Sequence, residues 1–372
     1  MITDRPSAPS ERNTVPALSD IPAHVRDAFT PQMRRVVEHQ LERAAQRSAP
    51  RGAGPAGEAT GADAGSRAAE AEGALAAARA EYREERAFWN VGGPKMHDTR
   101  DLSIRTSGAD VPVRMHRPSS DEMLPAIVYL HGGGFTVGDL DTHDRITRVL
   151  AAISGAAVVA VDYTLAPKGA FPVSLHESAG VVAHLAAHGG RYGIDGQRLA
   201  VAGDSAGAML ALGATLLLRD EPGRLGEQAE GAEQAFASLR AMLLYYGGYG
   251  LADSLSARLY GGFWDGMAAE DLRVIDDVFL TQPEDRTSSY TNLLSADIES
   301  TLPPSYVIGA DLDPLRDDSI ALARRLEAAG HDVQWRVVPG VLHSFLHFGR
   351  MLDAANEAIA GGAMFARSRF FS

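Results

Sequence analysis

The sequence predicts an α/β fold with a mostly parallel central sheet flanked by helices. From about residue 101 onward, short apolar runs rich in β-branched residues alternate with amphipathic helical stretches. Strands that are buried on both faces and separated by helices are typical of a parallel sheet. Apolar residues make up 45% of the 372-residue chain, which is enough for a sizeable core. A hairpin is expected first, over 102–106 and 111–117, and the further expected strands are 126–130, 157–161, 199–202, 242–246, 305–308 and 333–338.

The first 90 residues are predicted to form a separate helical segment. Apolar residues at helical spacing over 31–46, and an Ala-, Glu- and Arg-rich stretch over 67–89, each predict a helix. Between them, residues 48–66 are rich in Ala, Gly and Pro and hold no aromatic residue, which predicts a flexible insertion. The expected division is therefore a segment over 1–90 and a main domain over 91–372.

The main domain is itself interrupted between about residues 247 and 303. The alternation of strands and helices lapses there into a mixed stretch. It carries the aromatic residues Tyr249, Tyr260, Phe263, Trp264, Phe279 and Tyr290. We interpret this stretch as an inserted cap over the sheet.

Charge and composition exclude several classes of partner. The formal net charge is −13, only two lysines occur, and the arginines are scattered, so neither nucleic acid nor an anionic membrane surface is an expected partner. The absence of cysteine excludes disulfides, thiolate metal sites and cysteine nucleophiles. No signal-peptide pattern and no apolar run near the roughly 20 residues of a membrane span is seen. We expect a soluble, cytoplasmic protein; a homo-oligomer is compatible with the sequence, which says nothing about a regulatory protein partner.

The sequence Gly203-Asp204-Ser205-Ala206-Gly207 follows the expected strand 199–202 and precedes a helical stretch. This is the context that a nucleophile elbow requires, because the turn is so tight that the serine backbone is strained and its neighbours must be small. The five residues alone are a weak signal, and a strand-to-helix turn with a serine cap is the alternative. Their position at the end of a strand favours Ser205 as a nucleophile.

A run of three glycines follows the expected strand 126–130, in His131-Gly132-Gly133-Gly134-Phe135. Consecutive glycines cost backbone entropy and therefore need a reason. Acyl transfer supplies one, since a tetrahedral oxyanion needs backbone N–H groups at close range with no side chain in the way. The expected donors are Gly133, Gly134 and Ala206. A phosphate-binding loop is the alternative, but the Gly-Lys-Ser/Thr that it needs is not nearby.

A serine hydroxyl becomes a good nucleophile only when a neutral imidazole accepts its proton. In this arrangement the chain order is Ser, then Asp or Glu, then His, so the base must follow Ser205. Three histidines do so, namely His331, His343 and His347. His343 is preferred because it lies just past the last expected strand, where a loop can reach the serine.

The acid of such a triad should follow the expected strand 305–308. The carboxyl groups there are Asp311, Asp313, Asp317 and Asp318. Asp313 precedes Pro314, which can start a helix, so Asp313 lies in the loop that faces the site. We therefore expect Asp313 to hold His343 in the right tautomer and to stabilise its imidazolium.

No metal ion or cofactor is expected. His184 with His188, and His343 with His347, have the i,i+4 spacing of helical metal ligands. Neither pair has the Glu of a His-Glu-x-x-His motif, and no third ligand is suggested. Solvated histidines at a helix end explain His184 and His188 more simply.

These motifs resemble those of the bacterial hormone-sensitive-lipase-like branch of the α/β-hydrolases, and especially the bacterial acetyl esterases. That branch is marked by HGGG followed by an aromatic residue, by GDSAG, by a DPL-type acid motif and by a late histidine. The corresponding residues here are 131–135, 203–207, 313–315 and 343–345, and further matching stretches are 138–146, 161–167, 203–212, 261–266 and 342–351. The resemblance runs from about Leu18 to the C-terminus, with the insertion at 48–66 unmatched.

The resemblance implies an α/β-hydrolase fold and a serine carboxylesterase for short-chain acyl esters, acetyl esters first. It implies the triad Ser205–Asp313–His343, and a cap built from the N-terminal helices and residues 247–303 over a short acyl pocket. Two positions depart from the branch. Ala208 stands where Gly is usual, and Lys168 stands where Glu is usual. The second change inverts a charge near the substrate entrance and puts the local ion pairing in question.

Two other functions remain open at this point. A catalytically idle binding or regulatory protein would keep the fold, although here each predicted triad member is present. An amidase or deacetylase would use the same triad on a different bond. A dehalogenase or epoxide hydrolase would need an aspartate in place of Ser205, and a Ser-x-x-Lys enzyme would need a serine three residues before a lysine, which this chain lacks.

Overall fold

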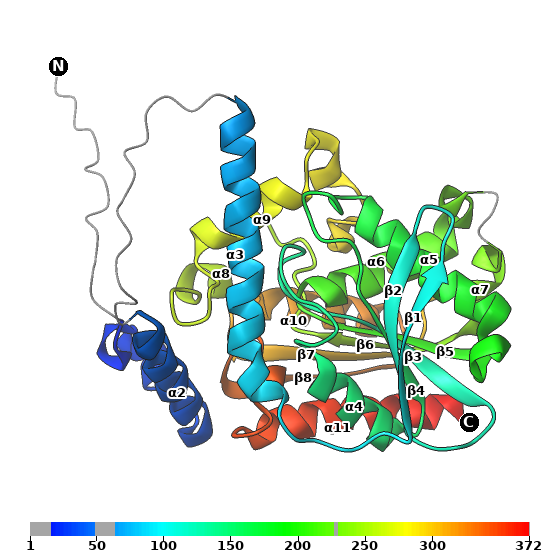
Figure 1. The fold of residues 1–372 in the computed structure, drawn as a ribbon, viewed down its shortest axis with the longest axis horizontal. Coiled ribbons are helices and arrows are strands. Elements are labelled where there is room, and N and C mark those ends of the chain that lie inside the picture. The colour runs from blue at the N-terminus through cyan, green and yellow to red at the C-terminus, as the bar shows by residue number, and fades with distance from the viewer. Residues whose placement is uncertain (1–15, 49–63, 227–229, 372) are drawn as a thin grey trace.

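The computed structural model describes residues 16–48, 64–226 and 230–371. Its centre is an eight-stranded sheet with the order β1-β2-β4-β3-β5-β6-β7-β8 (Figure 1). The pairs β1–β2 and β2–β4 are antiparallel, and the other neighbouring strands are parallel. The strands are β1 (Asp98–Arg105), β2 (Asp110–Arg117), β3 (Leu124–Leu130), β4 (Ala157–Val161), β5 (Ile194–Asp204), β6 (Leu239–Tyr245), β7 (Ser305–Leu312) and β8 (Val333–Leu342). The predicted fold class is confirmed, and each expected strand overlaps an observed one.

Two hydrophobic cores form because the central strands are buried on both faces. β3 and β4 are buried along their whole length, and successive side chains of a strand point to opposite faces. Alternate residues of β3 therefore enter different cores: Val128 and Leu130 enter one, and Ile127 and Tyr129 enter the other.

Helices cover both faces of the sheet, as Figure 1 shows. The first core is completed by α5 (Val173–His188), α6 (Ala206–Asp220), α7 (Ala232–Ser238) and α10 (Arg316–Ala328), and the second by α4 (Asp144–Ser154) and α11 (Asp353–Phe370). The parallel strands then all end at one edge of the sheet. The loops that follow β3, β5, β7 and β8 meet at this edge, which is where open α/β sheets place their sites.

The N-terminal segment contributes α2 (Pro31–Ser48) and α3 (Ala64–Asn90). Figure 1 shows α3 standing beside the sheet, with its C-terminal end close to α4 and α11. Trp89 near that end is buried, with its ring 4.9 Å from the ring of Phe348. Further along α3, Arg79 donates hydrogen bonds to the carbonyl oxygens of Thr136 (2.9 Å) and Ala166 (2.8 Å). α3 is thus attached to the loop that follows β3. Of the predicted insertion over 48–66, residues 49–63 lie outside the described residues.

Residues 247–303 contain α8 (Leu255–Leu259), α9 (Ala269–Phe279) and short 3₁₀ helices. A buried carboxylate fixes the start of this stretch to α10. Oδ1 of Asp318 accepts hydrogen bonds from the N–H groups of Tyr249 (2.6 Å), Gly250 (2.9 Å) and Leu251 (3.1 Å). The segment where the chain leaves β6 is therefore held by three hydrogen bonds from backbone N–H groups to the Asp318 side chain.

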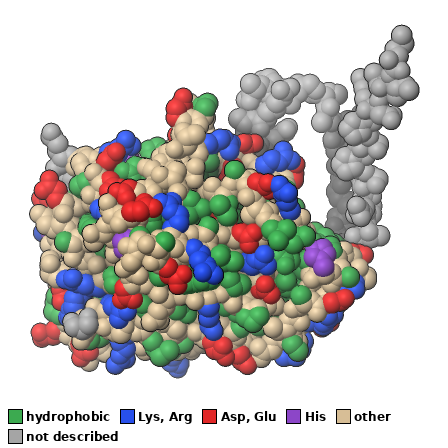
Figure 2. Space-filling model, turned by 180° about the vertical axis from the view of Figure 1, so that it is seen from behind, with side chains coloured by type: hydrophobic (Ala, Val, Ile, Leu, Met, Phe, Trp, Pro, Cys, Tyr) green, Lys and Arg blue, Asp and Glu red, His purple; other side chains and the backbone are tan. Residues whose placement is uncertain are grey.

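The surface carries charges of both signs. On the face shown in Figure 2, acidic and basic side chains are interspersed among apolar and polar ones. That face shows no broad basic field of the kind that binds nucleic acid without regard to sequence. None of the described helices is both long and apolar enough to cross a membrane.

Candidate active site

Ser205 lies in a strained turn between β5 and α6. Its backbone angles are φ 53° and ψ −123°, in a region that non-glycine residues rarely adopt. The Ser205 N–H donates a hydrogen bond to the carbonyl oxygen of Tyr245 at 2.8 Å, which helps to hold this conformation. A Cβ atom on Gly203 would overlap the carbonyl oxygen of Gly207, and a Cβ on Gly207 would overlap that of Leu130. Both glycines of the motif are therefore required by the packing of the turn.

The structure brings together the serine, histidine and aspartate selected from the sequence. Oγ of Ser205 lies 2.9 Å from Nε2 of His343, and Nδ1 of His343 lies 2.7 Å from Oδ2 of Asp313. Asp313 is fully buried, and its Oδ1 accepts the N–H of Leu315 at 2.8 Å. With a proton on Nδ1 donated to Asp313, Nε2 of His343 is left to accept the hydroxyl proton of Ser205.

The charge of Asp313 sets the basicity of His343. Burial alone would lower the pKa of His343, but the adjacent Asp313 carboxylate outweighs it, so the pKa lies above the ordinary histidine value. The carboxylates of Asp265 and Asp204 raise the pKa of His343 further. A histidine in this setting accepts a proton readily and stays neutral only toward higher pH.

The glycine loop after β3 has a conformation that needs glycine. Gly133 and Gly134 have φ values of +121° and +57°, and a Cβ on Gly134 would lie 2.7 Å from Cδ1 of Ile275 in α9. Ala206, the third predicted donor, is the first residue of α6. The first N–H groups of a helix have no partner within the helix and carry partial positive charge. The start of α6 lies against the beginning of this loop, because a Cβ on Gly207 would overlap the carbonyl oxygens of Leu130 and His131.

Asp204 joins the elbow to the glycine loop, which the sequence did not predict. Its Oδ1 accepts the hydroxyl of Tyr129 at 2.7 Å and the N–H of Gly132 at 3.0 Å. Its Oδ2 accepts the hydroxyl of Tyr246 at 3.3 Å. Burial alone would raise the pKa of Asp204, but the rings of His143 and His347 and the Tyr129 hydroxyl hold it below its usual range. Asp204 is therefore an anion that fixes the position of the loop relative to Ser205.

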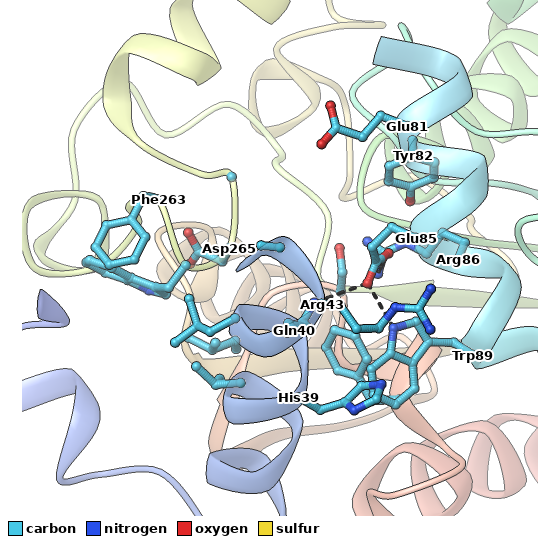
Figure 3. A pocket seen from close by; sticks show the side chains of 18 of the residues that line it. His39, Gln40, Arg43, Glu81, Tyr82, Glu85, Arg86, Trp89, Phe263 and Asp265 are labelled. Atoms are coloured by element: carbon cyan, nitrogen blue, oxygen red, sulfur yellow. Dashed lines mark hydrogen bonds and ion pairs between the residues drawn. The ribbon is translucent and has the colours of Figure 1, made fainter. Parts of the chain in front are cut away.

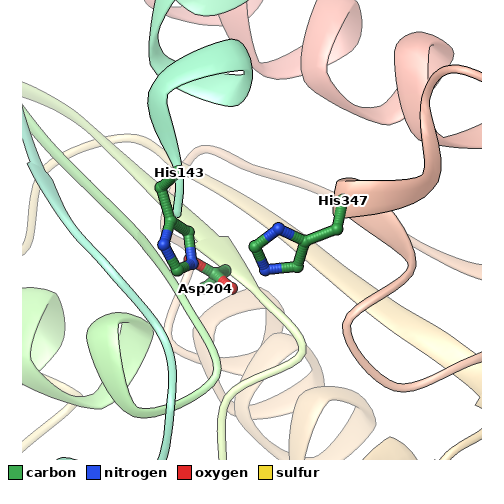
Figure 4. A group of neighbouring side chains, drawn as sticks. All are labelled: His143, Asp204 and His347. Atoms are coloured by element: carbon green, nitrogen blue, oxygen red, sulfur yellow. The ribbon is translucent and has the colours of Figure 1, made fainter. Parts of the chain in front are cut away.

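A group of two histidines and Asp204 has the composition of a metal site (Figure 4). His143, Asp204 and His347 are buried, and one ligand atom of each lies within 4.8 Å of the others. The Asp204 carboxylate already accepts three hydrogen bonds from neighbouring groups, so a metal would have to displace them. Burial holds the pKa of His347 well below its ordinary value. We interpret the group as a polar network around a buried carboxylate, in which the His347 imidazole is neutral.

The other candidates from the sequence lie elsewhere. Nε2 of His331 is 2.7 Å from the carbonyl oxygen of Ile298. His184 contacts the hydroxyl of Tyr192 at 3.1 Å, and His188 is paired with Glu230 at 2.8 Å. The remaining acids bind backbone groups: Asp311 accepts from Gly340, Asp317 from Ser256 and Asp318 from residues 249–251.

Lys168 pairs with the N-terminal segment. Its Nζ lies 3.7 Å from Oε1 of Glu72 in α3, and both side chains are largely exposed. An exposed ion pair of this kind contributes at most about 1 kcal/mol to the free energy of unfolding. The departure from the usual Glu thus changes a surface contact and leaves the buried site untouched.

A cavity of about 420 Å³ opens beside His343 (Figure 3). Its walls come from α2, from α3, from the turn 263–266 and from residues 342–344 at the end of β8. Figure 3 shows Phe263 and Asp265 on one side of it and Tyr82, Glu85 and Arg86 of α3 on the other. Asp265 lies in the stretch 261–266 that matches the bacterial acetyl esterases, but the residue pattern indicates no role for it.

Comparison with known proteins places the chain among hydrolases. A family model described as the alpha/beta hydrolase fold matches residues 127–347. An acetyl esterase of Salmonella choleraesuis is 40% identical over 299 residues, which is 80% of this chain and 88% of that protein.

Solved structures agree with this placement. An esterase of Pyrobaculum calidifontis superposes with a TM-score of 0.72 at 31% identity, covering 79% of this chain and 93% of that one. A thermophilic carboxylesterase cloned from a metagenomic library gives the same TM-score at 30% identity, over 80% and 97% of the two chains.

Proposed function

The chain belongs to the α/β-hydrolase-fold family and is a carboxylic ester hydrolase, and we propose that it hydrolyses short-chain acyl esters, acetyl esters first. The observation that carries the proposal is the hydrogen-bonded series Ser205–His343–Asp313 at the ends of β5, β8 and β7. We assign Ser205 the role of nucleophile and His343 the role of general base and then general acid. Asp313 is the carboxylate that orients His343.

In the proposed first step, Oγ of Ser205 attacks the carbonyl carbon of the ester while Nε2 of His343 takes the hydroxyl proton. Asp313 stabilises the imidazolium that forms. The negative charge that develops on the carbonyl oxygen is met by the N–H groups of Gly133, Gly134 and Ala206. Donors of this kind are each worth about 10²- to 10³-fold in kcat.

The tetrahedral intermediate then collapses. His343 gives its proton to the leaving alcohol oxygen, and the acyl group stays on Ser205 as an ester. Water then attacks this acyl-enzyme with His343 again as the base, releasing the acid and restoring Ser205.

Two observations support short acyl chains. The relative that is 40% identical is an acetyl esterase. α9 also lies against the glycine loop: the Phe279 ring is stacked on Phe135 at 3.6 Å, and Ile275 touches Gly134. We propose that residues 247–303 and the segment 1–90 form a cap over the catalytic domain, and that its packing leaves little room for a long acyl chain beside the oxyanion donors.

Hydrolysis of p-nitrophenyl esters from C2 to C12 tests the proposal. We expect kcat/KM to be highest at C2 to C4. The change Ser205→Ala should lower kcat by several orders of magnitude, because without the nucleophile only the oxyanion donors and binding remain. A maximum at C10 or above would contradict short-chain specificity and leave the triad intact. Full activity of Ser205→Ala would contradict the triad itself.

A fluorophosphonate probe gives an independent readout. It should label the wild-type protein on Ser205 and leave Ser205→Ala unlabelled, since the probe reports an activated serine and not the choice of ester.

A further inference from the structure

The cavity beside His343 lies on the alcohol side of the proposed reaction. His343 gives its proton to the leaving alcohol oxygen, so that oxygen must lie close to Nε2. The cavity is bounded by His343 and its neighbours Leu342 and Ser344, whereas the oxyanion donors Gly133 and Gly134 are not among its lining residues. We therefore expect a substituent on the alcohol to extend toward this cavity and the acyl chain to lie on the side of the glycine loop.

Asp265 lines this cavity and has one carboxylate oxygen without a hydrogen-bond partner among the described residues. Its Oδ1 accepts the N–H groups of Gly262 at 2.9 Å and Met267 at 3.1 Å, which closes the turn 262–267. Its Oδ2 is buried and has no hydrogen-bond partner among the described residues. Oδ1 alone satisfies the structural need of the turn, and an asparagine would do the same. The fold therefore gives no role to Oδ2 of Asp265 or to the charge of this carboxylate.

Glu85, another carboxylate of the cavity, is by contrast fully engaged. It accepts from Nε2 of Gln40 at 3.3 Å, accepts from Nε1 of Trp89 at 2.8 Å, and pairs with Arg86 at 3.0 Å. Glu81 is exposed at the rim. Among the carboxylates that line the cavity, Asp265 is therefore the one with a buried oxygen that has no partner among the described residues.

A buried cation lies on the opposite wall. Arg86 is 8% exposed, and its Nε has no hydrogen-bond partner among the described residues. Its guanidinium lies 4.6 Å from the ring centroid of Tyr82. Arg43 and Arg47 also line the cavity, so an alcohol that carried a positive charge would be repelled by the arginines, and one that carried a negative charge would be repelled by Asp265. A neutral hydroxyl group can both donate to a carboxylate and accept from a guanidinium.

We propose that this cavity binds the alcohol part of the substrate. The alcohol is neutral and carries further hydroxyl groups, as glycerol or a sugar does. Oδ2 of Asp265 accepts a hydrogen bond from one of these hydroxyl groups. The inference rests on the proposed esterase function and names its substrate class. Asp265 is thus a specificity-determining residue and takes no part in bond making.

The electrostatics of Asp265 agree with this role. Burial raises the pKa of Asp265 to about 7, and its two backbone hydrogen bonds reduce the shift only in part. A hydroxyl donor would favour the charged form. The preference for a hydroxyl-bearing alcohol should therefore grow from pH 6 to pH 8 as the carboxyl ionises.

The test compares two acetyl esters of equal carbon number, glycerol 1-monoacetate and propyl acetate. The measured quantity is the ratio of their kcat/KM values, for the wild type and for Asp265→Asn. Asparagine keeps an oxygen for Gly262 and Met267 but replaces the buried charged acceptor by a donor. The wild type should favour the glycerol ester, and the ratio should fall about tenfold or more in the variant, the value of a hydrogen bond to a charged group.

The matched control is Asp271→Asn, which makes the same change at an exposed position on α9 outside the cavity. Its ratio should equal that of the wild type. A second readout is the pH profile with propyl acetate. Because the Asp265 charge raises the pKa of His343, Asp265→Asn should move the midpoint of kcat/KM to lower pH, which a purely structural role would not do.

The outcomes separate the two proposals. Equal ratios in the wild type and Asp265→Asn, with both esters hydrolysed, contradict the alcohol site and leave the esterase function standing. A wild type that prefers propyl acetate contradicts it without any variant, so the test does not depend on the variant folding. A wild type that hydrolyses neither these esters nor p-nitrophenyl acetate contradicts the esterase proposal as well.

Discussion

At the scale of single residues, the chemistry depends on two buried carboxylates with different tasks. Asp313 faces His343 and controls its proton affinity. Asp204, the residue before the nucleophile, holds the glycine loop through the Gly132 N–H and the Tyr129 hydroxyl. In the proposed mechanism, the first orients the base, and the second holds the loop that binds the oxyanion. Because Asp313 acts through His343, its loss should change the pH dependence of kcat/KM. Because Asp204 acts through the glycine loop, its loss should lower kcat.

The pH dependence of kcat/KM follows from the surroundings of His343. Only the neutral imidazole can accept the Ser205 proton, and the pKa of His343 is raised. Activity should therefore be low in acid and should rise with pH through a midpoint above the ordinary histidine pKa of about 6.5. The measurement is kcat/KM for p-nitrophenyl acetate from pH 5 to 9. A flat profile would rule out His343 as the base.

At the scale of elements, each functional group is placed by the end of a strand. The sequence predicted this arrangement because apolar β-branched runs stand out and because glycine and proline mark the turns after them. It did not predict the partners of Asp204, since Tyr129 and Gly132 are more than 70 residues away along the chain. It did not predict the role of Asp265 either. Whether a carboxylate is buried and unpartnered depends on the packing of α2 and α3 around it, which carries no local signal.

The glycine loop offers a test at this scale. Gly134→Ala would place a Cβ 2.7 Å from Cδ1 of Ile275 and force alanine to adopt φ +57°. Moving the loop should displace its N–H groups and lower kcat for p-nitrophenyl acetate by about 10²-fold. The control is Gly92→Ala, at φ +84° with open space around the Cβ position. It carries comparable backbone strain, of about 1–2 kcal/mol, and should lower Tm without lowering kcat. Equal kcat values in the two variants would mean that the loop does not bind the oxyanion.

At the scale of the whole molecule, three carboxyl groups make stability depend on pH. Burial raises the pKa of Asp162 to about 6, of Asp265 to about 7 and of Asp318 to about 6. In the unfolded chain such groups titrate near pH 3.9. Between these values the folded protein binds more protons than the unfolded one, so these groups remove stability as pH rises. Burying the charged forms of these groups therefore costs folding free energy.

This cost can be measured at Asp265. The Tm of Asp265→Asn minus that of the wild type should be more positive at pH 8 than at pH 5, because only at pH 8 does the wild type bury an unpaired charge. The corresponding change in the free energy of unfolding is at most about 4 kcal/mol, because the pKa differs by about three between the folded and unfolded states and each pKa unit is worth 1.36 kcal/mol. Asp271→Asn, which is exposed, should show the same difference at both pH values. A difference for Asp265→Asn that does not change with pH would show that its carboxylate is not buried unpaired.

The turn 262–267 has a consequence for engineering. Asp265 closes it by accepting hydrogen bonds from the N–H groups at both of its ends, so the turn keeps its shape largely from within. It touches the cavity through Phe263, Trp264, Asp265 and Gly266, while the nucleophile, base and oxyanion donors lie on other segments. A library confined to Phe263 and Trp264, with Asp265 kept to close the turn, should change the alcohols that the enzyme accepts and leave the catalytic residues in place.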